Sequence, residues 1–176
     1  MGFDSILDDT LVDRTRQFFY CSGEARMIIN HRFAHDYLHK INDVNSEIIG
    51  QVNEIVLNNL HSKAGIFRSY GDVLISGSSY IPTSNGKLLE EYFNIMIVKS
   101  KDYDCLNQAF YLFSRLPYLQ PYFDGNKRTS RLLRNNILLQ NNICPLSFYS
   151  NRHDYIKSLL GFYELVDDSY LRYLYY

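Results

Sequence analysis

The chain of 176 residues contains no tryptophan, only four prolines and three cysteines, and no apolar run that approaches the length of a membrane span. Cys21, Cys105 and Cys144 are far apart and odd in number, which excludes a disulfide framework and the paired spacing of a zinc site. The start, MGFDSILDDT, lacks the basic and apolar regions of a secretory signal. We therefore expect a cytoplasmic protein without a membrane partner.

An excess of positive charge is also missing. Lysine and arginine number 18 against 19 aspartates and glutamates, so the formal net charge is -1. Proteins that bind nucleic acid in general carry a basic excess, because phosphate contacts supply most of their affinity. We expect no nucleic-acid partner, and any anion site must be local.

The scarcity of proline leaves long stretches with apolar residues at three- and four-residue spacing, which predicts helices. Hydrophobic residues make up 46% of the chain, enough for one folded domain over 1–176. The expected fold class is all-α, a mainly helical bundle. The third predicted helix has Gly50 as its weak point. The predicted helices span residues 5–19, 25–41, 46–63, 87–100, 103–116, 127–140, 153–165 and 169–176.

One segment, about residues 65–85, departs from the helical pattern. Its sequence VLISGSSYIP predicts two short strands around a turn at Gly77 and Ser78. A two-stranded hairpin is marginal alone and must lean on helices. We expect one small β-hairpin here, a flap on the helical bundle.

The most informative stretch is LQPYFDGNKRTSRLLRN, residues 119–135. Pro117 and Pro121 predict that no helix runs through residues 116–125, and Gly125 supplies a tight turn. Helical periodicity resumes at Lys127. The backbone amides of residues 126–128 then lie at a helix N-terminus, where they can bind an anion.

The side chains of this stretch agree with an anion site. Lys127, Arg128 and Arg131 occupy neighbouring faces of the first helical turns, where cations oppose the helix dipole unless an anion is bound. Asp124 is a hard oxygen ligand suited to Mg²⁺ between phosphates, and Tyr122 can point inward and anchor the loop. The alternative is a solvated basic helix start with Asp124 as a simple N-terminal acid.

Residues 120–131 read Gln-Pro-Tyr-Phe-Asp-Gly-Asn-Lys-Arg-Thr-Ser-Arg. They resemble the signature loop of the Fic family (Fic/Doc, the Fido fold), which reads His-Pro-Phe-x-Asp/Glu-Gly-Asn-Gly/Lys-Arg-x-x-Arg. The segment AGIFRSYGDVLISGSSYIP and the helices that flank the loop also resemble the family. The likeness covers about residues 20–170 and implies a Fic-like helical fold.

The resemblance implies a transferase that moves AMP, or less often phosphate, from Mg-ATP to a hydroxyl of a target protein. The family loop suggests Asp124 for Mg²⁺, Gly125 and Asn126 for the anion hole, and Arg128 for phosphate, with Arg131 in support. Lys127 replaces the second glycine of the commoner motif, as in the Doc-like branch, which transfers phosphate. The target would dock by strand addition at the flap residues Val73, Leu74, Ile75 and Tyr80.

Gln120 stands where the family has its catalytic histidine. A carboxamide can orient a hydroxyl but cannot accept its proton, and a positioned base is typically worth about 10²- to 10⁴-fold in rate. Two hypotheses therefore stay open. One is a weakened or altered transferase; the other is an inactive module of the same fold that binds nucleotide or phosphate and a partner protein.

Many relatives carry an inhibitory Ser/Thr-x-x-x-Glu segment, but no Ser or Thr of this chain has Glu four residues later. Where YCSGEARMI would supply that segment, Arg26 takes the Glu position. Arg26 would repel Arg131 rather than neutralise it. Regulation then comes from a separate antitoxin-like chain, or a disabled site needs none.

Three further patterns have weaker implications. His31, His35 and His39 form one helical stripe, but no second cluster completes a metal site. His61 and His153 are alternative bases in principle. Tyr170, Tyr173 and Tyr176 are spaced to pack as a stripe of the C-terminal helix against the core.

Overall fold

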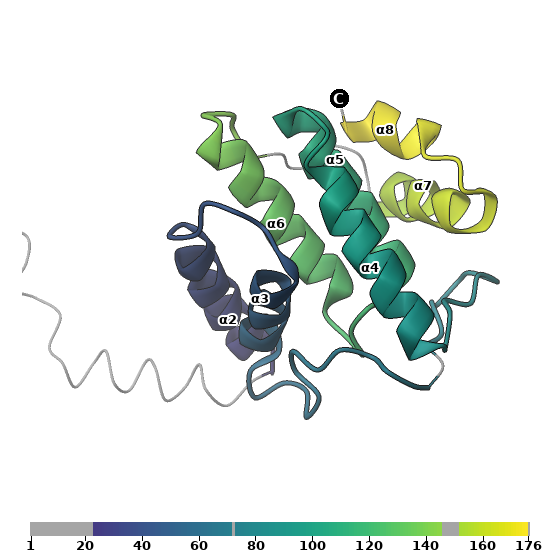
Figure 1. The fold of residues 1–176 in the computed structure, drawn as a ribbon, viewed down its shortest axis with the longest axis horizontal. Coiled ribbons are helices and arrows are strands. Elements are labelled where there is room, and N and C mark those ends of the chain that lie inside the picture. The colour runs from purple at the N-terminus through teal and green to yellow at the C-terminus, as the bar shows by residue number, and fades with distance from the viewer. Residues whose placement is uncertain (1–22, 72, 146–151, 176) are drawn as a thin grey trace, which may run out of the picture.

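The computed structural model of the chain describes residues 23–71, 73–145 and 152–175, and these are mainly helical. The predicted helix 5–19 lies outside the described residues. Helices α5 and α6 run side by side through the middle, with α2 and α3 beside α6 and with α7 and α8 beyond α5 (Figure 1). The described helices are α2 (Gly23–Leu38), α3 (Ser46–Leu57), α4 (Gly86–Ser100), α5 (Cys105–Leu119), α6 (Asn126–Gln140), α7 (Arg152–Leu165) and α8 (Ser169–Tyr175).

Helix α5 separates two hydrophobic clusters and is buried on both sides. Leu112 and Leu116 face the larger cluster, which α2, α3, α4 and α6 complete. Phe110 and Phe113 face a smaller one, built with α7, α8 and Ile75 of the flap segment. Each fully buried side chain of this size contributes about 1.5–3 kcal/mol relative to an exposed one. The packing of α5 against both clusters therefore fixes its position among the surrounding helices.

Helix α2 buries a different face from the one that its larger apolar residues indicate. Of its larger apolar residues, Ile28 and Phe33 are 71% and 56% exposed. Ala25, Ala34 and Leu38 are buried instead. Alanine allows a close approach between α2 and α3, and a sequence pattern weighted by side-chain size does not detect that.

Helix α5 runs through Pro117 to Leu119, so the prediction that no helix passes this proline was wrong. A proline inside a helix costs about 3 kcal/mol, because it removes one hydrogen bond and crowds the preceding turn. Here it lies in the last turn, where the backbone N–H of Gln120 still reaches the carbonyl of Leu116 at 3.1 Å. Burial of α5 against α6 offsets the cost.

The neighbouring helix boundaries are closer to expectation. Helix α6 begins at Asn126, one residue before the predicted start at Lys127. Helix α3 ends at Leu57 rather than 63, because Asn59 takes a left-handed conformation with φ 57°. The Asn30 side chain of α2 donates to the carbonyl of Asn58 at 2.8 Å, which satisfies a group at the end of α3.

The predicted β-hairpin is not formed in the described part of residues 65–85. The strands expected on either side of the turn are absent there, and the segment makes a single isolated bridge, Phe67 to Tyr122. A turn does form one residue earlier than predicted, with the N–H of Ser78 bonded to the carbonyl of Ile75 at 3.1 Å and Gly77 at φ 84°. Contacts with α7 replace the cross-strand pairing, as shown below.

The tyrosine stripe of the C-terminal helix does not face the core. Tyr173 is 78% exposed and Tyr170 lies against it, with ring centroids 6.5 Å apart; Tyr176 lies outside the described residues. Leu171 and Tyr175, spaced i, i+4, are buried instead. A seven-residue helix has room for only one buried face, and this pair occupies it.

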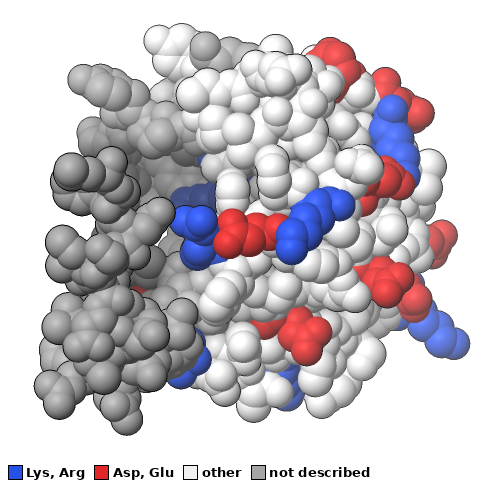
Figure 2. All heavy atoms as spheres, turned by 90° about the vertical axis from the view of Figure 1, so that its left-hand side faces the viewer, with Lys and Arg blue, Asp and Glu red and all other residues white. Residues whose placement is uncertain are grey.

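The distribution of charge and the character of the helices both bear on the partners of the protein. Cationic and anionic side chains are interspersed on the face that lies to the left in Figure 1, where α2 is found (Figure 2). In the part of the chain that the structure describes, no helix has the length and apolar character that a membrane span requires.

Candidate functional site

The loop between α5 and α6 is closed by the side chain of Gln120, which ends α5 in the left-handed conformation with φ 51°. Its Nε2 donates to the carbonyl of Pro117 at 2.6 Å, and its Oε1 accepts from Asn126 Nδ2 at 2.8 Å. The residue is only 8% exposed. Both ends of the carboxamide therefore hold the loop to the helices on either side.

Asn126 completes the closure at the first residue of α6. Its Oδ1 accepts from the backbone N–H of Tyr122 at 3.1 Å, and its Nδ2 also donates to the Tyr122 carbonyl at 2.7 Å. Tyr122 is buried, as predicted, with its ring edge-on to Phe67 and Phe93. Packing of this ring anchors the middle of the loop to the main core.

Asn53 of α3 supports the loop from below and was not singled out from the sequence. It is fully buried, and its Nδ2 donates to the Asp124 carbonyl at 2.9 Å and to Thr129 Oγ1 at 3.2 Å. Its Oδ1 accepts from the N–H of Gly65 at 3.1 Å. The only sequence signal was a polar residue at a core position of an amphipathic helix.

Gly125 is required where α6 begins. Its φ is 76°, and a Cβ built on it would lie 2.9 Å from Asn53 Nδ2 and 3.2 Å from Leu57. The residue serves as N-cap without any side-chain hydrogen bond. An α-helix leaves its first N–H groups without intrahelical partners, so the amides of the first turn depend on another acceptor.

Arg68, also missed from the sequence, joins the flap segment to the loop. The side chain is buried, with Nε donating to the Gln120 carbonyl at 3.0 Å and Nη1 to the Gly71 carbonyl at 2.8 Å. Its backbone N–H donates to the Pro121 carbonyl at 2.8 Å. These bonds hold residues 67–71 alongside the loop.

The flap segment and the loop enclose one cavity of about 390 Å³. This volume falls within the usual range of small-molecule sites, about 300–1,000 Å³. The flap contributes residues 73–76 and the loop contributes Gln120 and residues 123–128. The predicted site residues Val73, Leu74, Ile75, Gln120, Asp124, Gly125, Asn126, Lys127 and Arg128 are thus brought together.

Contacts with α5 and α7 fix the flap segment over this cavity. Ile75 is buried in the second cluster, and Tyr80 stacks on Tyr118 with ring centroids 4.4 Å apart. The carboxylate of Glu164 accepts from the N–H of Ser79 at 3.0 Å and from the Ser78 hydroxyl at 3.2 Å. These bonds replace the cross-strand bonds of a hairpin, and they leave Leu74 80% exposed.

The start of α6 carries an excess of positive charge, although Arg128 pairs with Asp124 at 2.9 Å. Loss of hydration and the charge of Arg131 lower the pKa of Lys127. Burial, Arg128 and Arg131 likewise lower the pKa of His31 on the adjacent α2. Each cation here disfavours the next, and a bound anion would relieve that repulsion.

Two predicted residues point elsewhere. The guanidinium of Arg131 lies over the ring of Tyr155, 5.1 Å from its centroid, and does not line the cavity. Tyr80 is engaged with Tyr118. The alternative bases His61 and His153 do not line this cavity either.

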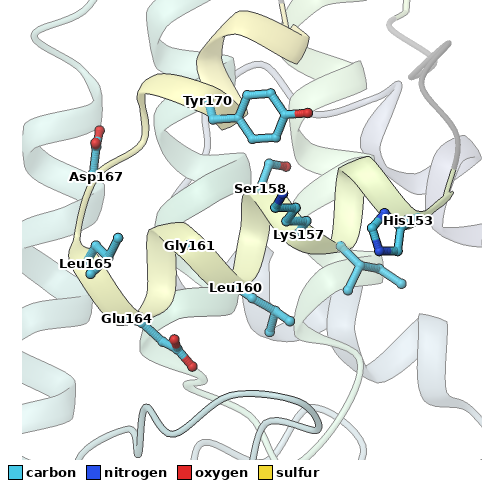
Figure 3. Close-up of a pocket in the computed structure, with 10 residues that line it drawn as sticks. His153, Lys157, Ser158, Leu160, Gly161, Glu164, Leu165, Asp167 and Tyr170 are labelled. Atoms are coloured by element: carbon cyan, nitrogen blue, oxygen red, sulfur yellow. The ribbon is translucent and has the colours of Figure 1, made fainter.

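A larger cavity, about 490 Å³, lies on the outer side of α7. Its lining comes from α7, the following turn and Tyr170 of α8, and it includes His153 and Lys157 (Figure 3). It is open to solvent, and its lining includes the apolar side chains of Ile156, Leu160 and Leu165. The loop cavity, although smaller, brings together polar groups from the loop and the start of α6 beside the flap segment.

The donor groups of the loop cavity suit a phosphate compound better than a protein-only metal site. Among the described residues that line it, Asp124 is the only carboxylate. Within the described residues, no three His, Cys, Asp or Glu side chains are close enough to hold a metal, and the stripe of His31, His35 and His39 forms no such site. Mg²⁺ is commonly held by one or two carboxylates together with substrate phosphates, and Asp124 fits that role.

Comparison with known proteins gives a consistent result. The family model described as "Fic/DOC family" matches residues 40–138. The chain is 30% identical over 129 residues to the protein adenylyltransferase Fic of Nematostella vectensis, which covers 69% of this chain and 29% of that protein. The chain therefore spans less than a third of the length of this curated relative.

Solved structures show the same fold. A fragment of Fic-1 from C. elegans superposes with a TM-score of 0.72 at 22% identity, covering 86% of this chain and 48% of that one. The BepC protein of Bartonella tribocorum, solved with bound AMPPNP, has a TM-score of 0.67 at 10% identity, covering 90% and 85% of the two chains. With a family match over more than half of its residues and this shared helical fold, the chain belongs to the Fic/DOC family.

Proposed function

We propose that this protein binds Mg-ATP in the loop cavity and transfers AMP, or phosphate, to a hydroxyl of a target protein, at a rate reduced by Gln120. The observation that carries the proposal is the single cavity lined by both the flap segment 73–76 and the loop residues 120–128. Donor and acceptor substrates must meet in one place for group transfer, and this cavity has a wall for each.

The loop wall supplies the donor site. The backbone amides at the start of α6 have no side-chain cap, and the helix dipole makes that end favourable for phosphate. Arg128 and Lys127 line the same wall. Burial lowers the pKa values of Lys127 and His31, and the charges of Arg131 on both and of Arg128 on His31 lower them further. Phosphate oxygens would offset the repulsion among these cations. The nucleotide-bound state of the BepC protein is a precedent for the fold.

Asp124 is the residue that would hold Mg²⁺. Its Oδ1 accepts from the Gly125 N–H at 2.6 Å, and its Oδ2 contacts Arg128. The metal would supply charge neutralisation on the phosphates. A carboxylate already oriented by the loop backbone loses little freedom when it takes up that role.

The flap wall supplies the acceptor site. Leu74 is exposed beside the cavity, and residues 73–76 line it without being paired to a strand in the described part of the chain. An extended segment of a target can bond to such a free edge by strand addition. The target's hydroxyl would then lie opposite the loop.

The reaction forms a bond between the target hydroxyl oxygen and phosphorus. For AMP transfer the bond to the leaving pyrophosphate breaks; for phosphate transfer the leaving group is ADP. The hydroxyl proton must go to water or to the leaving group, because the carboxamide of Gln120 cannot accept it. The absent base would cost about 10²- to 10⁴-fold in rate.

A second function is favoured by the bonding of Gln120 itself. Both ends of its carboxamide are engaged with Pro117 and Asn126, so the residue acts as part of the loop framework. This arrangement supports a module that binds nucleotide and holds a partner at the flap without turnover. A transferase would need a separate chain to regulate its activity, whereas an inactive binding module would need none.

The test uses ATP labelled on the α- or γ-phosphate, incubated with Mg²⁺, the purified protein and cell lysate. We expect weak labelling of a target protein, stronger labelling by Gln120→His, and none by Asp124→Ala. Labelling from the α-phosphate identifies AMP transfer, and labelling from the γ-phosphate identifies phosphate transfer. Absence of labelling by both wild type and Gln120→His, with Mg-ATP binding intact, would support the binding module instead.

A further inference from the structure

A second cavity lined by cations lies between α4, α5 and α8. Its volume is about 320 Å³, and it shares no lining residue with the loop cavity. Its main lining residues are Lys99, Tyr103, Tyr111, Arg115, Asp168 and Arg172. In a chain whose net charge is -1, three cations around one hollow require a physical reason.

The fold assembles this cavity from three helices. Asn107, Tyr111 and Arg115 are spaced i, i+4 and i+8, so they form one stripe along α5. Lys99 lies in the last turn of α4, and Arg172 projects from α8. None of these positions belongs to the loop at the other end of α5.

Both arginines are held in place before any ligand binds. Asp168 contacts Arg115 at 3.3 Å and Arg172 at 3.5 Å. The guanidinium of Arg115 also lies 4.4 Å from the Phe162 ring centroid, and that of Arg172 lies 4.3 Å from Phe110. Preorganised side chains lose little conformational entropy on binding, so their hydrogen bonds count more fully.

The cavity retains positive charge after these pairings. One carboxylate, Asp168, serves two arginines, and Lys99 makes no ion pair within the described residues. Three cations against one anion leave two positive charges unmatched. The rings of Tyr103 and Tyr111, with centroids 5.2 Å apart, form an adjacent wall whose hydroxyls can donate hydrogen bonds.

We propose that this cavity is a binding site for phosphate, either the inorganic ion or the phosphate group of a small organic monoester. A doubly charged tetrahedral anion matches the two unmatched charges. Arginine forks and a lysine ammonium are the donors that bind phosphate oxygens most strongly. The hollow has room for more than the ion, and the tyrosine wall would contact an organic substituent.

The experiment follows backbone and side-chain amides of the full chain by NMR during titration with inorganic phosphate, and separately with phenyl phosphate, at constant ionic strength. Saturable shifts at Asn107, Tyr111 and Arg172 are expected. The amide of Gly125 reports binding at the loop independently. Tighter binding of phenyl phosphate would identify an organic monoester as the ligand, and equal affinities would identify the ion.

Lys99→Gln is the main variant, because Lys99 is exposed and its loss leaves the core packing intact. It should weaken phosphate binding at this cavity about fivefold or more, as should Arg172→Gln. Arg32→Gln is the matched control, since Arg32 makes the same i, i+4 type of pair, with Asp36 at 3.0 Å on α2. Shifts confined to the loop, shifts that do not saturate, or equal affinity in all three variants would overturn the proposal. Because the Gly125 amide reports binding at the loop cavity, the test of this second phosphate site does not depend on the proposed transferase function.

Discussion

Asp124 and Arg128 form an ion pair, with Nη2 and Oδ2 2.9 Å apart, across the first turn of α6 at the edge of the loop cavity. The two residues are the ones that the proposed function assigns to metal and to phosphate. The pair is half-exposed, so its contribution to stability is small, of order 0–1 kcal/mol. Its position matters more than its energy, because it keeps both groups oriented toward one hollow.

Arg128→Ala should weaken Mg-ATP binding about tenfold or more while it changes the free energy of unfolding by less than about 1 kcal/mol. Calorimetric titration and urea unfolding measure the two quantities. Arg32→Ala, which removes the comparable exposed pair with Asp36, should leave nucleotide affinity unchanged. Equal affinities for wild type and Arg128→Ala would remove this residue from the donor site.

Asn53→Ala should lower the free energy of unfolding by about 2–4 kcal/mol, because it removes three hydrogen bonds that are buried or partly buried. It should also weaken Mg-ATP binding, since the loop loses its support under Asp124. Asn30→Ala removes an equally buried amide that bonds to the carbonyls of Val56 and Asn58 and not to the loop. That variant should lose stability and keep nucleotide affinity. The comparison separates the role of Asn53 in positioning the loop from a general loss of stability.

Gly125→Ala should destabilise the protein by about 1–3 kcal/mol from its positive φ alone, and further because the new Cβ would lie 2.9 Å from Asn53 Nδ2. Gly71→Ala provides the comparison, with φ 83° and no atom within 4 Å of its Cβ. The difference between the two losses in the free energy of unfolding, measured with urea, gives the cost of the steric clash at Gly125. A loss in Gly125→Ala no greater than in Gly71→Ala would contradict the close packing of Asn53 beneath the loop.

Stability should fall in mild acid because of His31. Burial and the charges of Arg128 and Arg131 lower its pKa from 6.5. The unfolded chain therefore takes up a proton at this residue at a higher pH than the folded chain does. The free energy of unfolding decreases as the pH drops below about 6.5 and levels off below the lowered pKa.

His31→Asn should remove this part of the acid sensitivity, as measured by urea unfolding across the pH range 5–8. An NMR titration of the His31 ring in Arg128→Ala provides the second check. Removal of the neighbouring charge should raise the pKa of His31 toward its ordinary value. An unchanged pKa in that variant would show that Arg128 does not contribute to the shift.

Glu164→Gln should loosen the flap turn, since the carboxylate accepts hydrogen bonds from Ser78 and Ser79 that lower its pKa. Faster hydrogen exchange of the Ser79 amide is the expected result. Glu90→Gln, an exposed glutamate on α4, should leave that exchange rate unchanged. Equal protection of Ser79 in wild type and Glu164→Gln would show that Ile75 and Tyr80 suffice to hold the flap.

The sequence alone determined the helical class and the loop that identifies the family. Apolar spacing predicted helices over the residues of α4, α5 and α6, and Gly125 with the residues after it predicted where α6 begins to within one residue. These features depend on neighbours within a few positions along the chain, which is why a pattern detects them. Tyr122 of the loop was also expected to point inward, and it is buried.

The tertiary structure decided what depends on contacts between distant segments. Helix α5 continues through Pro117 because burial of its two faces outweighs a local penalty. The flap stays unpaired because Glu164, far along the chain, takes the bonds of its turn. Asn53 and Arg68 reach the loop from segments more than 50 residues away. No local pattern records which buried polar group will meet which carbonyl, and only the packed chain brings them within hydrogen-bond distance.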